Sequence, residues 1–394
     1  MFLPIGDEPN SRTTPYVNYA ILIANVAIFV LISLPLTFQR VDANDPTLID
    51  YLQVMVRDTG AGPRDILTRM SAYDLFVFNH GFRPGAPAVV DLFVSLFLHA
   101  GWLHLAGNML FLWIFGDNVE HRIGRARYLL LYLGAGVVAT LFFSLLSLGS
   151  MVPLVGASGA ISGVLGAYFS WFPRNRVRVL VWLFIFVDVI RLPARWVLGF
   201  YLLVDNLLPF VFGQGAGGVA YGAHIGGFFA GLGGSWLMDR WGSREATLHA
   251  WVRPADAAPT HVPPDPLAEN TRFDAAARAG QWDQAVRVYA GMALHERQRL
   301  LDDDVLHMTD WLTEVGRGDT ALAVLQRYIA THPLGAALPA AHLRAGLLQL
   351  RERGQPTAAY QHLLTVLDLA PHGAQADAAR AALSEIESHR QRLH

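Results

Sequence analysis

The stretch Gly156-Ala-Ser-Gly-Ala-Ile-Ser-Gly163 opens an apolar segment that ends at Trp171. From Ser158 to Trp171 a helix would measure roughly 21 Å at 1.5 Å per residue, whereas the hydrocarbon core of a bilayer is about 30 Å thick. We therefore expect a helix that begins inside the membrane at Ser158, after non-helical backbone over residues 152–157. Such backbone is tolerated only where protein or a water-filled cavity surrounds it. A hydrolase within a membrane needs that water.

The whole chain has the composition of a membrane protein. Of its 394 residues 53% are hydrophobic and only 16% are charged, which is too apolar for an ordinary soluble domain. The net charge of −2 indicates no nucleic-acid partner, and the absence of Cys excludes disulfides, thiolate catalysis and Cys-based zinc sites. Six apolar segments are long enough to span a bilayer: 16–36, 89–115, 128–148, 155–171, 196–212 and 217–238.

Charges in the short loops predict the orientation of these spans. Arg residues gather in the loops after the second and fourth spans and directly after the sixth, whereas residues 149–153 and 213–216 carry none. Since basic loops stay in the cytoplasm, both termini are expected there. Residues 177–190 are interpreted as an interfacial or lead-in segment to the fifth span; the alternative is a seventh span, which would place the C-terminus on the other side.

Beyond the membrane part, residues 1–242, the chain changes character. Residues 243–270 are rich in Pro and Ala and predict a linker, and residues 271–394 predict a soluble, Ala- and Leu-rich helical domain. Three segments that place Ala five residues after Gly recur at intervals of 36 and 38 residues: Gly280–Ala285, Gly316–Ala321 and Gly354–Ala359. Tetratricopeptide repeats have a similar period and helix–turn–helix unit. A generic helical bundle is the alternative.

Polar residues inside apolar spans mark functional sites. The second span contains His99, His104 and Asn108, and the sixth contains His224. If the second helix begins near Gly101, then His104, Ser158 and His224 all lie at a similar depth below the outer surface. Two His residues are also metal ligands in many proteins, but a zinc protease within a span would be expected to show His-Glu-x-x-His, which the sequence lacks.

The chemistry of such a site follows from the residue types. A Ser hydroxyl needs a neighbouring base, and His224 can serve Ser158 if their helices pack closely. The small-xxx-small pairs on both helices, Gly159/Gly163 and Gly227/Gly231, allow this approach. His104 and Asn108 lie one helical turn apart and can donate to a developing oxyanion, together with the Ser158 backbone N–H.

These motifs, in this order, resemble the rhomboid family of intramembrane serine proteases over roughly residues 4–241. The resemblance implies a Ser158–His224 dyad, an oxyanion hole of His104, Asn108 and Ser158, a six-helix core and no cofactor or metal. It further implies cleavage of other membrane proteins in or near their transmembrane segments. It assigns supporting roles to a further set: His99, Gly156, Gly159, Ala223, Gly227, Gly231, Glu120, Arg122 and Gly124.

The chain departs from the family at Ser162. Some members place an aromatic residue here, one turn after the nucleophile, where it supports the catalytic His. The residue that orients His224 is therefore not evident from the sequence.

The fold expected is all-α: a six-helix rhomboid core followed by a cytoplasmic tetratricopeptide-like domain. The expected function is an intramembrane serine endopeptidase whose partners are transmembrane substrates, the lipid bilayer and a cytoplasmic protein for residues 271–394. The expected location is the bacterial inner membrane. Two alternatives stay open. One is a non-catalytic chaperone or adaptor on the same core; the other is a proton-coupled transporter, which predicts acidic partners deep within the spans.

Overall fold

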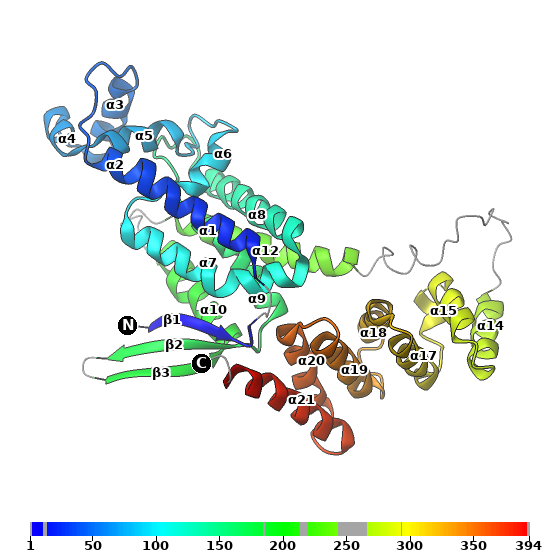
Figure 1. The fold of residues 1–394 in the computed structure, drawn as a ribbon. Coiled ribbons are helices and arrows are strands. Elements are labelled where there is room, and N and C mark those ends of the chain that lie inside the picture. Colours follow the sequence, from blue (N-terminus) through cyan, green and yellow to red (C-terminus); the bar gives the residue numbers. More distant parts are fainter. Residues whose placement is uncertain are drawn as a thin grey trace. The chain divides into compact units, whose positions relative to one another are not determined.

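The computed structural model describes residues 2–10, 14–183, 186–212, 220–242, 266–292 and 294–391. The chain divides into two compact units, Met1–Trp236 and Leu237–His394. Helices dominate both units (Figure 1). Most of the predicted linker, 243–270, lies outside the described residues, and the predicted domain boundaries stay predictions.

Three helical stretches of the first unit are long and apolar enough to cross a membrane. The first, Tyr16–Thr37, joins α1 (Tyr16–Ile28), a π-helical segment (Phe29–Ser33) and α2 (Leu34–Thr37). The second is α8 (Arg125–Leu146). The third, Ala194–Phe212, joins α10 (Ala194–Leu202), the π-helical segment η3 (Leu203–Leu207) and α11 (Leu208–Phe212). These helices make the chain a membrane protein.

The remaining predicted spans have other shapes. Residues 89–115 correspond to a broken helix: Asp91–Phe97, made of α6 (Asp91–Val94) and a 3₁₀ turn (Ser95–Phe97), meets α7 (Trp102–Ile123) at 95°. Helix α9 (Ser158–Trp171) has 14 residues, and α12 (Tyr221–Gly242) has 22. The six-span topology therefore stays a prediction. Two finer expectations are confirmed, because α7 starts directly after Gly101 and α9 starts at Ser158.

Helices α9 and α12 pack at backbone distance. A Cβ atom at Gly227 would overlap the carbonyl oxygen of Gly159, and one at Gly231 would overlap that of Gly163. No residue other than Gly fits these positions without moving a helix. The predicted small-residue interface is thus confirmed, and it brings the start of α9 beside the start of α12.

The all-α prediction is wrong at the N-terminus and between α9 and α10. Strands β1 (Phe2–Glu8), β2 (Arg176–Leu183) and β3 (Phe186–Pro193) form an antiparallel sheet in the order β1-β2-β3 (Figure 1). The strands lead directly into α10, so residues 177–190 are not the alternative seventh span, and their interfacial placement stays a prediction. The signal was present as Arg-Val-Arg-Val over 176–179, a period-2 alternation rich in β-branched residues. The apolar run that follows hides this period.

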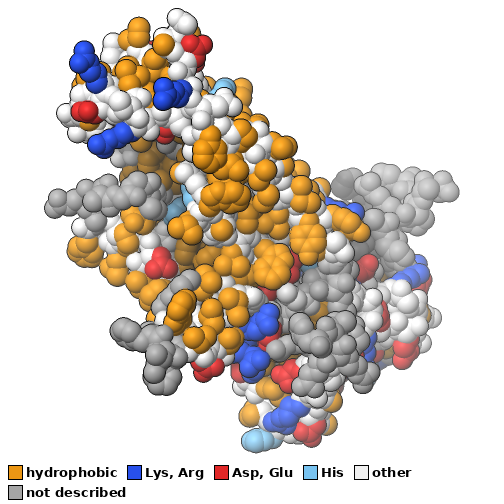
Figure 2. Space-filling model, turned by 60° about the vertical axis from the view of Figure 1, so that its left-hand side comes forward, with side chains coloured by type: hydrophobic (Ala, Val, Ile, Leu, Met, Phe, Trp, Pro, Cys, Tyr) orange, Lys and Arg blue, Asp and Glu red, His pale blue; other side chains and the backbone are white. Residues whose placement is uncertain are grey.

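The outer part of the first unit holds three short helices: α3 (Leu48–Thr59), α4 (Pro63–Arg69) and α5 (Ala72–His80). They share a small apolar core around Tyr51, Ile66 and Phe78. Tyr73 on α5 donates a 2.8 Å hydrogen bond to the backbone carbonyl of His99. This bond ties the outer segment to the break before α7. Hydrophobic side chains cover much of the face of the helical part in Figure 2, as expected where lipid is the solvent.

The second unit is built of helices joined by short turns: α14 (Pro266–Arg278), α15 (Trp282–Gly291), α16 (Leu294–Arg297), α17 (Asp302–Glu314), α18 (Gly318–Thr331), α19 (Leu338–Arg351), α20 (Pro356–Leu369) and α21 (Ala374–Gln391). The three glycines that mark the repeats follow α14, α17 and α19 and have positive φ angles: Gly280 (66°), Gly316 (75°) and Gly354 (59°). Such a left-handed residue closes a helix and favours Gly.

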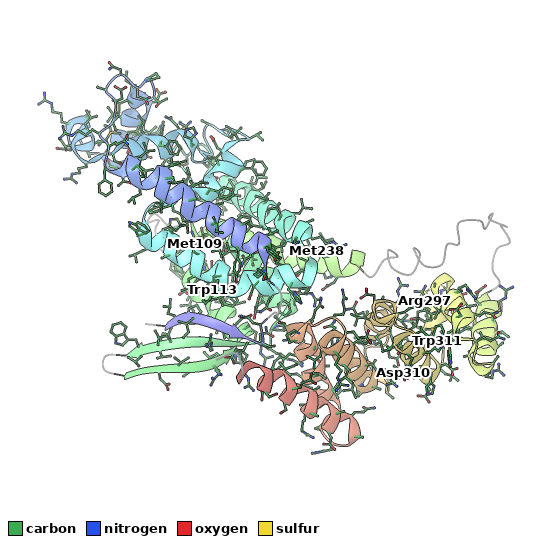
Figure 3. All side chains as sticks on the ribbon, in the orientation of Figure 1. Met109, Trp113, Met238, Arg297, Asp310 and Trp311 are labelled. Atoms are coloured by element: carbon green, nitrogen blue, oxygen red, sulfur yellow. The ribbon has the colours of Figure 1, made fainter. Side chains whose placement is uncertain are left out.

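Ion pairs repeat along this unit. Arg344 binds Asp310 of α17 (Figure 3) through two hydrogen bonds of 2.6 and 2.8 Å, and both residues are 34 positions apart. The pairs Arg317–Asp283 and Arg353–Asp319, at 3.4 Å each, have the same separation. A period of 34 supports repetition; the tetratricopeptide assignment itself stays a prediction.

Glu120, near the end of α7, caps α1. Its carboxylate accepts hydrogen bonds from the backbone N–H of Val17 (3.1 Å) and Asn18 (2.7 Å). The first N–H groups of a helix have no intrahelical acceptor, and α1 has no side-chain cap of its own. Glu120 is 3% exposed, so it satisfies these donors where water does not reach.

Replacing this cap should destabilise the first unit. Glu120→Ala leaves two buried donors unpaired, and we expect a loss of roughly 2–4 kcal/mol, since an unsatisfied buried group costs about 1–3 kcal/mol. Thermal unfolding in detergent measures the effect. Asp58→Ala, which removes a carboxylate that pairs with the neighbouring, exposed Arg57, is the control. Equal melting temperatures for the two variants would contradict the capping role.

Candidate active site

The starts of α9 and α12 bring Ser158 and His224 together. The Ser158 hydroxyl Oγ lies 2.8 Å from Nε2 of His224, although the residues are 66 positions apart. Both side chains are partly exposed. A Ser hydroxyl in hydrogen-bond contact with an imidazole is the arrangement that nucleophilic catalysis by Ser requires.

Asn206 orients the imidazole from its other side. Its Oδ1 lies 2.6 Å from Nδ1 of His224, and its Nδ2 donates a 2.7 Å hydrogen bond to the backbone carbonyl of Tyr201. The bond to Tyr201 fixes which end of the amide faces His224. Because Oδ1 only accepts, Nδ1 of His224 must carry the proton, and Nε2 then presents its lone pair to Ser158.

The π-helical segment η3 contributes to this position. Asn206 belongs to that segment, within an otherwise lipid-facing helix, and is only 1% exposed. A π-helical turn shifts the residues around it relative to an α-helix, and such turns are frequent at functional sites. The sequence analysis missed Asn206. The signal that could have found it is a polar pair, Asp205-Asn206, in the middle of the apolar segment 196–212.

One part of the expected oxyanion hole lies beside the nucleophile, at Gly156. A Cβ atom built on Gly156 would lie 2.9 Å from Nε2 of His104 and 3.6 Å from Oγ of Ser158. The missing side chain of Gly156 therefore leaves room beside the nucleophile for a small group. Nδ1 of His104 accepts a 3.4 Å hydrogen bond from the Ala100 N–H, so Nε2 carries the proton and faces this space.

The two other donors expected in the oxyanion hole have no hydrogen-bond acceptor in the described part of the chain. Nδ2 of Asn108 is buried and has no hydrogen-bond partner among the described residues. Ser158 is the first residue of α9, so its backbone N–H has no acceptor within the helix. Donors left unpaired in a buried place are costly, and an incoming carbonyl oxygen would satisfy them.

Ser162, the departure from the family pattern, has a partner on α10. Its Oγ lies 2.8 Å from the hydroxyl of Tyr201, whose ring packs against Phe111 with centroids 5.8 Å apart. The aromatic ring near the site thus comes from α10 rather than from α9. The same Tyr201 accepts the hydrogen bond from Asn206, so both contacts position His224 indirectly.

The other residues expected to have supporting roles lie at several places in the first unit. His99 is fully buried, and its ring contacts that of His104 at 5.1 Å. Arg122 lies over the ring of Trp171, 5.0 Å from its centroid. Gly124 has a φ of 81° at the turn between α7 and α8, where only Gly is unstrained. Ala223 is buried at the α9–α12 contact.

Among the described residues no group of three or more His, Cys, Asp or Glu side chains is arranged to hold a metal ion. The two neighbouring His residues, His99 and His104, contact each other through their rings. The donor set at Gly156 and the Ser158–His224 pair together suit acyl transfer, in which a nucleophile attacks a carbonyl and its oxygen becomes negative.

Comparison with known proteins agrees with this geometry. Residues 86–241 match the model of the Rhomboid domain. This segment is similar to the Rhomboid domain. It contains Ser158, His224, Asn206 and both expected side-chain donors of the oxyanion hole. The family that the motifs resemble is therefore supported by the comparison.

Curated relatives point the same way. The rhomboid protease GluP of Bacillus subtilis is 37% identical over 142 residues, which cover 35% of this chain and 25% of GluP. RHOMBOID-like protein 1 of Arabidopsis thaliana is 31% identical over 231 residues, 55% of this chain and 52% of the relative. The mitochondrial presenilin-associated rhomboid-like protein of Bos taurus is 28% identical over 174 residues, 41% of each chain. The chain thus spans between a quarter and about half of these relatives' lengths.

Filling the space at Gly156 should block the oxyanion hole. We expect Gly156→Ala to lower turnover of a transmembrane reporter substrate about 10²–10³-fold, the usual effect of losing one oxyanion donor. Its φ of 122° adds strain. Gly134→Ala on α8 is the control, because a Cβ there meets no atom within 4 Å. Full activity of a folded Gly156→Ala variant would contradict the assignment of the oxyanion to the space beside Gly156.

Removing the amide of Asn206 should impair turnover rather than substrate binding. We expect Asn206→Ala to lower kcat about 10–100-fold with little change in KM, because small displacements of a catalytic group cost up to about 10²-fold. Asn206→Asp keeps the acceptor oxygen and should restore part of the rate. Asn25→Ala removes a buried amide from α1 as the control. If all three variants lose activity only in proportion to their stability, Asn206 has a packing role.

Proposed function

We propose that the protein is an intramembrane serine endopeptidase that hydrolyses peptide bonds in or near transmembrane segments of other proteins. The observation that carries the proposal is the hydrogen-bond chain from Ser158 through His224 to Asn206. This chain supplies a nucleophile, a base in the right tautomer and a residue that orients the base. The Bacillus subtilis relative is named a rhomboid protease, which is consistent with this proposal.

The chemistry follows from the geometry. Ser158 Oγ attacks the scissile carbonyl carbon while its proton moves to Nε2 of His224. The carbonyl oxygen becomes negative in the space beside Gly156, where His104, Asn108 and the Ser158 N–H donate to it. The imidazolium then protonates the leaving amine. Water, activated by the same imidazole, hydrolyses the acyl-enzyme and regenerates the Ser158 hydroxyl.

Asn206 differs from the third member of a Ser-His-Asp triad, because an amide carries no charge. It fixes the tautomer and the ring angle of His224 but adds little electrostatic stabilisation to the imidazolium. We therefore describe the pair Ser158–His224 as the catalytic dyad and Asn206 as a positioning residue. In this proposal Asn206 supplies the orientation of His224 that the Ser158–His224 dyad needs.

Membrane substrates fit the surroundings of the site. The dyad lies at the start of two packed helices, and α9 is only 14 residues long. Non-helical backbone before α9 admits water to the depth of Ser158. Relatives include a Bacillus protein and mitochondrial proteins, so placement in the bacterial inner membrane with both termini in the cytoplasm stays a prediction.

The second candidate function is a non-catalytic membrane adaptor whose helical C-terminal unit binds a protein partner. The repeated Asp–Arg pairs favour it, since they mark a repeat architecture and such arrays offer extended binding surfaces. Adaptor and protease differ in whether Ser158 is reactive. A repeat domain can also recruit substrates to a protease, so binding of a partner by itself does not distinguish the two proposals.

Reaction with a fluorophosphonate probe separates the two. We expect the wild-type protein to be labelled in detergent, Ser158→Ala not to be labelled, and His224→Ala to react at least about 10²-fold more slowly, since general-base help contributes 10²–10⁴-fold. Ser144→Ala on α8 is the control, because the hydroxyl of this Ser donates a hydrogen bond to the Thr140 carbonyl within its own helix. Labelling that persists in Ser158→Ala would contradict the protease.

A further inference from the structure

The β2–β3 hairpin has one polar end and one apolar end. In the antiparallel register Arg178 pairs with Arg191 near the base, and Leu180 pairs with Val189 nearer the tip. Paired residues lie on the same face of a sheet. Val177 and Val179 on the opposite face are buried. The face turned away from the helices is therefore basic at its base and apolar toward its tip.

The apolar end is exposed to an unusual degree. Trp182 is 54% exposed and Val187, its partner across the strands, is 64% exposed. Phe2, at the same end of β1, is also exposed. The sequence between these strands is apolar as well: residues 183–186 are Leu-Phe-Ile-Phe. Water-facing sheets protect their edges and ends with charged or short strands, and clustered exposed apolar side chains mark an interaction surface.

The base of the hairpin adjoins a membrane span. Strand β3 ends at Pro193, and the apolar helical stretch Ala194–Phe212 begins at the next residue. Trp196 at this junction is exposed, and Arg195 lies 5.8 Å from its ring centroid. Trp and Arg at the end of a span mark the interface between lipid and water. From there the hairpin extends as a ribbon beyond the helices (Figure 1).

Charge at the base is unbalanced. The carboxylate of Glu8 on β1 lies 3.5 Å from Arg178 and 3.6 Å from Arg191, so one carboxylate serves two guanidinium groups. Arg176 is exposed at the same end. The other acidic residue of β1, Asp7, is buried and accepts a 2.8 Å hydrogen bond from Asn118. The outward face thus keeps a positive charge.

We propose that the β2–β3 hairpin is an interfacial membrane anchor that binds anionic phospholipids. Trp182, Val187 and Val189 lie at the boundary between headgroups and acyl chains, and Arg176 and Arg191 bind lipid phosphates. Strands β1 and β3 are edges with unpaired backbone groups, which do not occur in the hydrocarbon core. The headgroup layer, where water and phosphates satisfy those groups, is the depth that suits the sheet. The anchor would set the height of α10 and hence of Asn206.

The absence of Cys allows a direct test in the full-length protein. A polarity-sensitive fluorophore is attached to the Val187→Cys variant, which is placed in phosphatidylcholine vesicles with or without phosphatidylglycerol. The vesicles also contain a lipid that carries a quencher near its headgroup. Val315→Cys, another exposed Val (45%) on the second unit, is the control. We expect a blue shift and quenching at position 187 only. Water-like, unquenched emission at both positions would overturn the anchor.

A second variant tests the phosphate contacts. Phosphatidylglycerol should increase quenching at position 187, and Arg176→Gln with Arg191→Gln should abolish that increase while the response in phosphatidylcholine remains. An increase that persists in the double variant would contradict the role of these arginines. A blue shift that grows with protein density in the vesicles would instead indicate contact between copies of the chain and overturn the lipid assignment. No readout depends on proteolysis, so failure of the proposed function leaves the test valid.

Discussion

Everything at the candidate site depends on the backbone contact between α9 and α12. The carbonyl oxygens of Gly159 and Gly163 occupy the space where side chains at positions 227 and 231 would stand. At any larger helix separation, the Ser158 hydroxyl would lose the imidazole of His224, now 2.8 Å away. Inside lipid no hydrophobic force drives helices together, so packing of small residues supplies the contact. The contact between Ser158 and His224 therefore depends on the glycines that line both helices at their interface.

A second constraint is that buried polar groups in a membrane need partners. The structure meets it by pairing residues far apart in the chain. Glu120 near the end of α7 satisfies the start of α1, and Asn206 joins the π-helical segment η3 to α12 through His224. Asn118 binds Asp7 and so ties the N-terminal strand to α7; burial raises the pKa of Asp7 to about 7. Each pair places an element as well as removing a desolvation cost.

The donors at Gly156 are the complementary case, because they are buried and left without partners. Asn108 holds an amide donor that no described group accepts, and the N–H of Ser158 has no acceptor within α9. Other buried polar atoms among the described residues also lack partners, including both ring nitrogens of His99, but the donors of the expected oxyanion hole are those that a substrate oxygen bound beside Ser158 would reach. The cost of leaving them unpaired is returned when a substrate oxygen arrives, which is how a preorganised oxyanion site lowers a barrier.

Much of the site was predictable because its signals are local. A Ser after Gly-x, a His before a small-xxx-small pair, and the short apolar run after Ser158 each follow from a few neighbouring residues. The sequence by itself thus determined which residues form the candidate dyad, where α9 begins and which helix faces approach. The tertiary structure alone decided that Asn206 orients His224, that Tyr201 serves Ser162, and that β1 joins a hairpin 170 residues away. These depend on which distant backbone fills a given space, and local propensity carries no information about that.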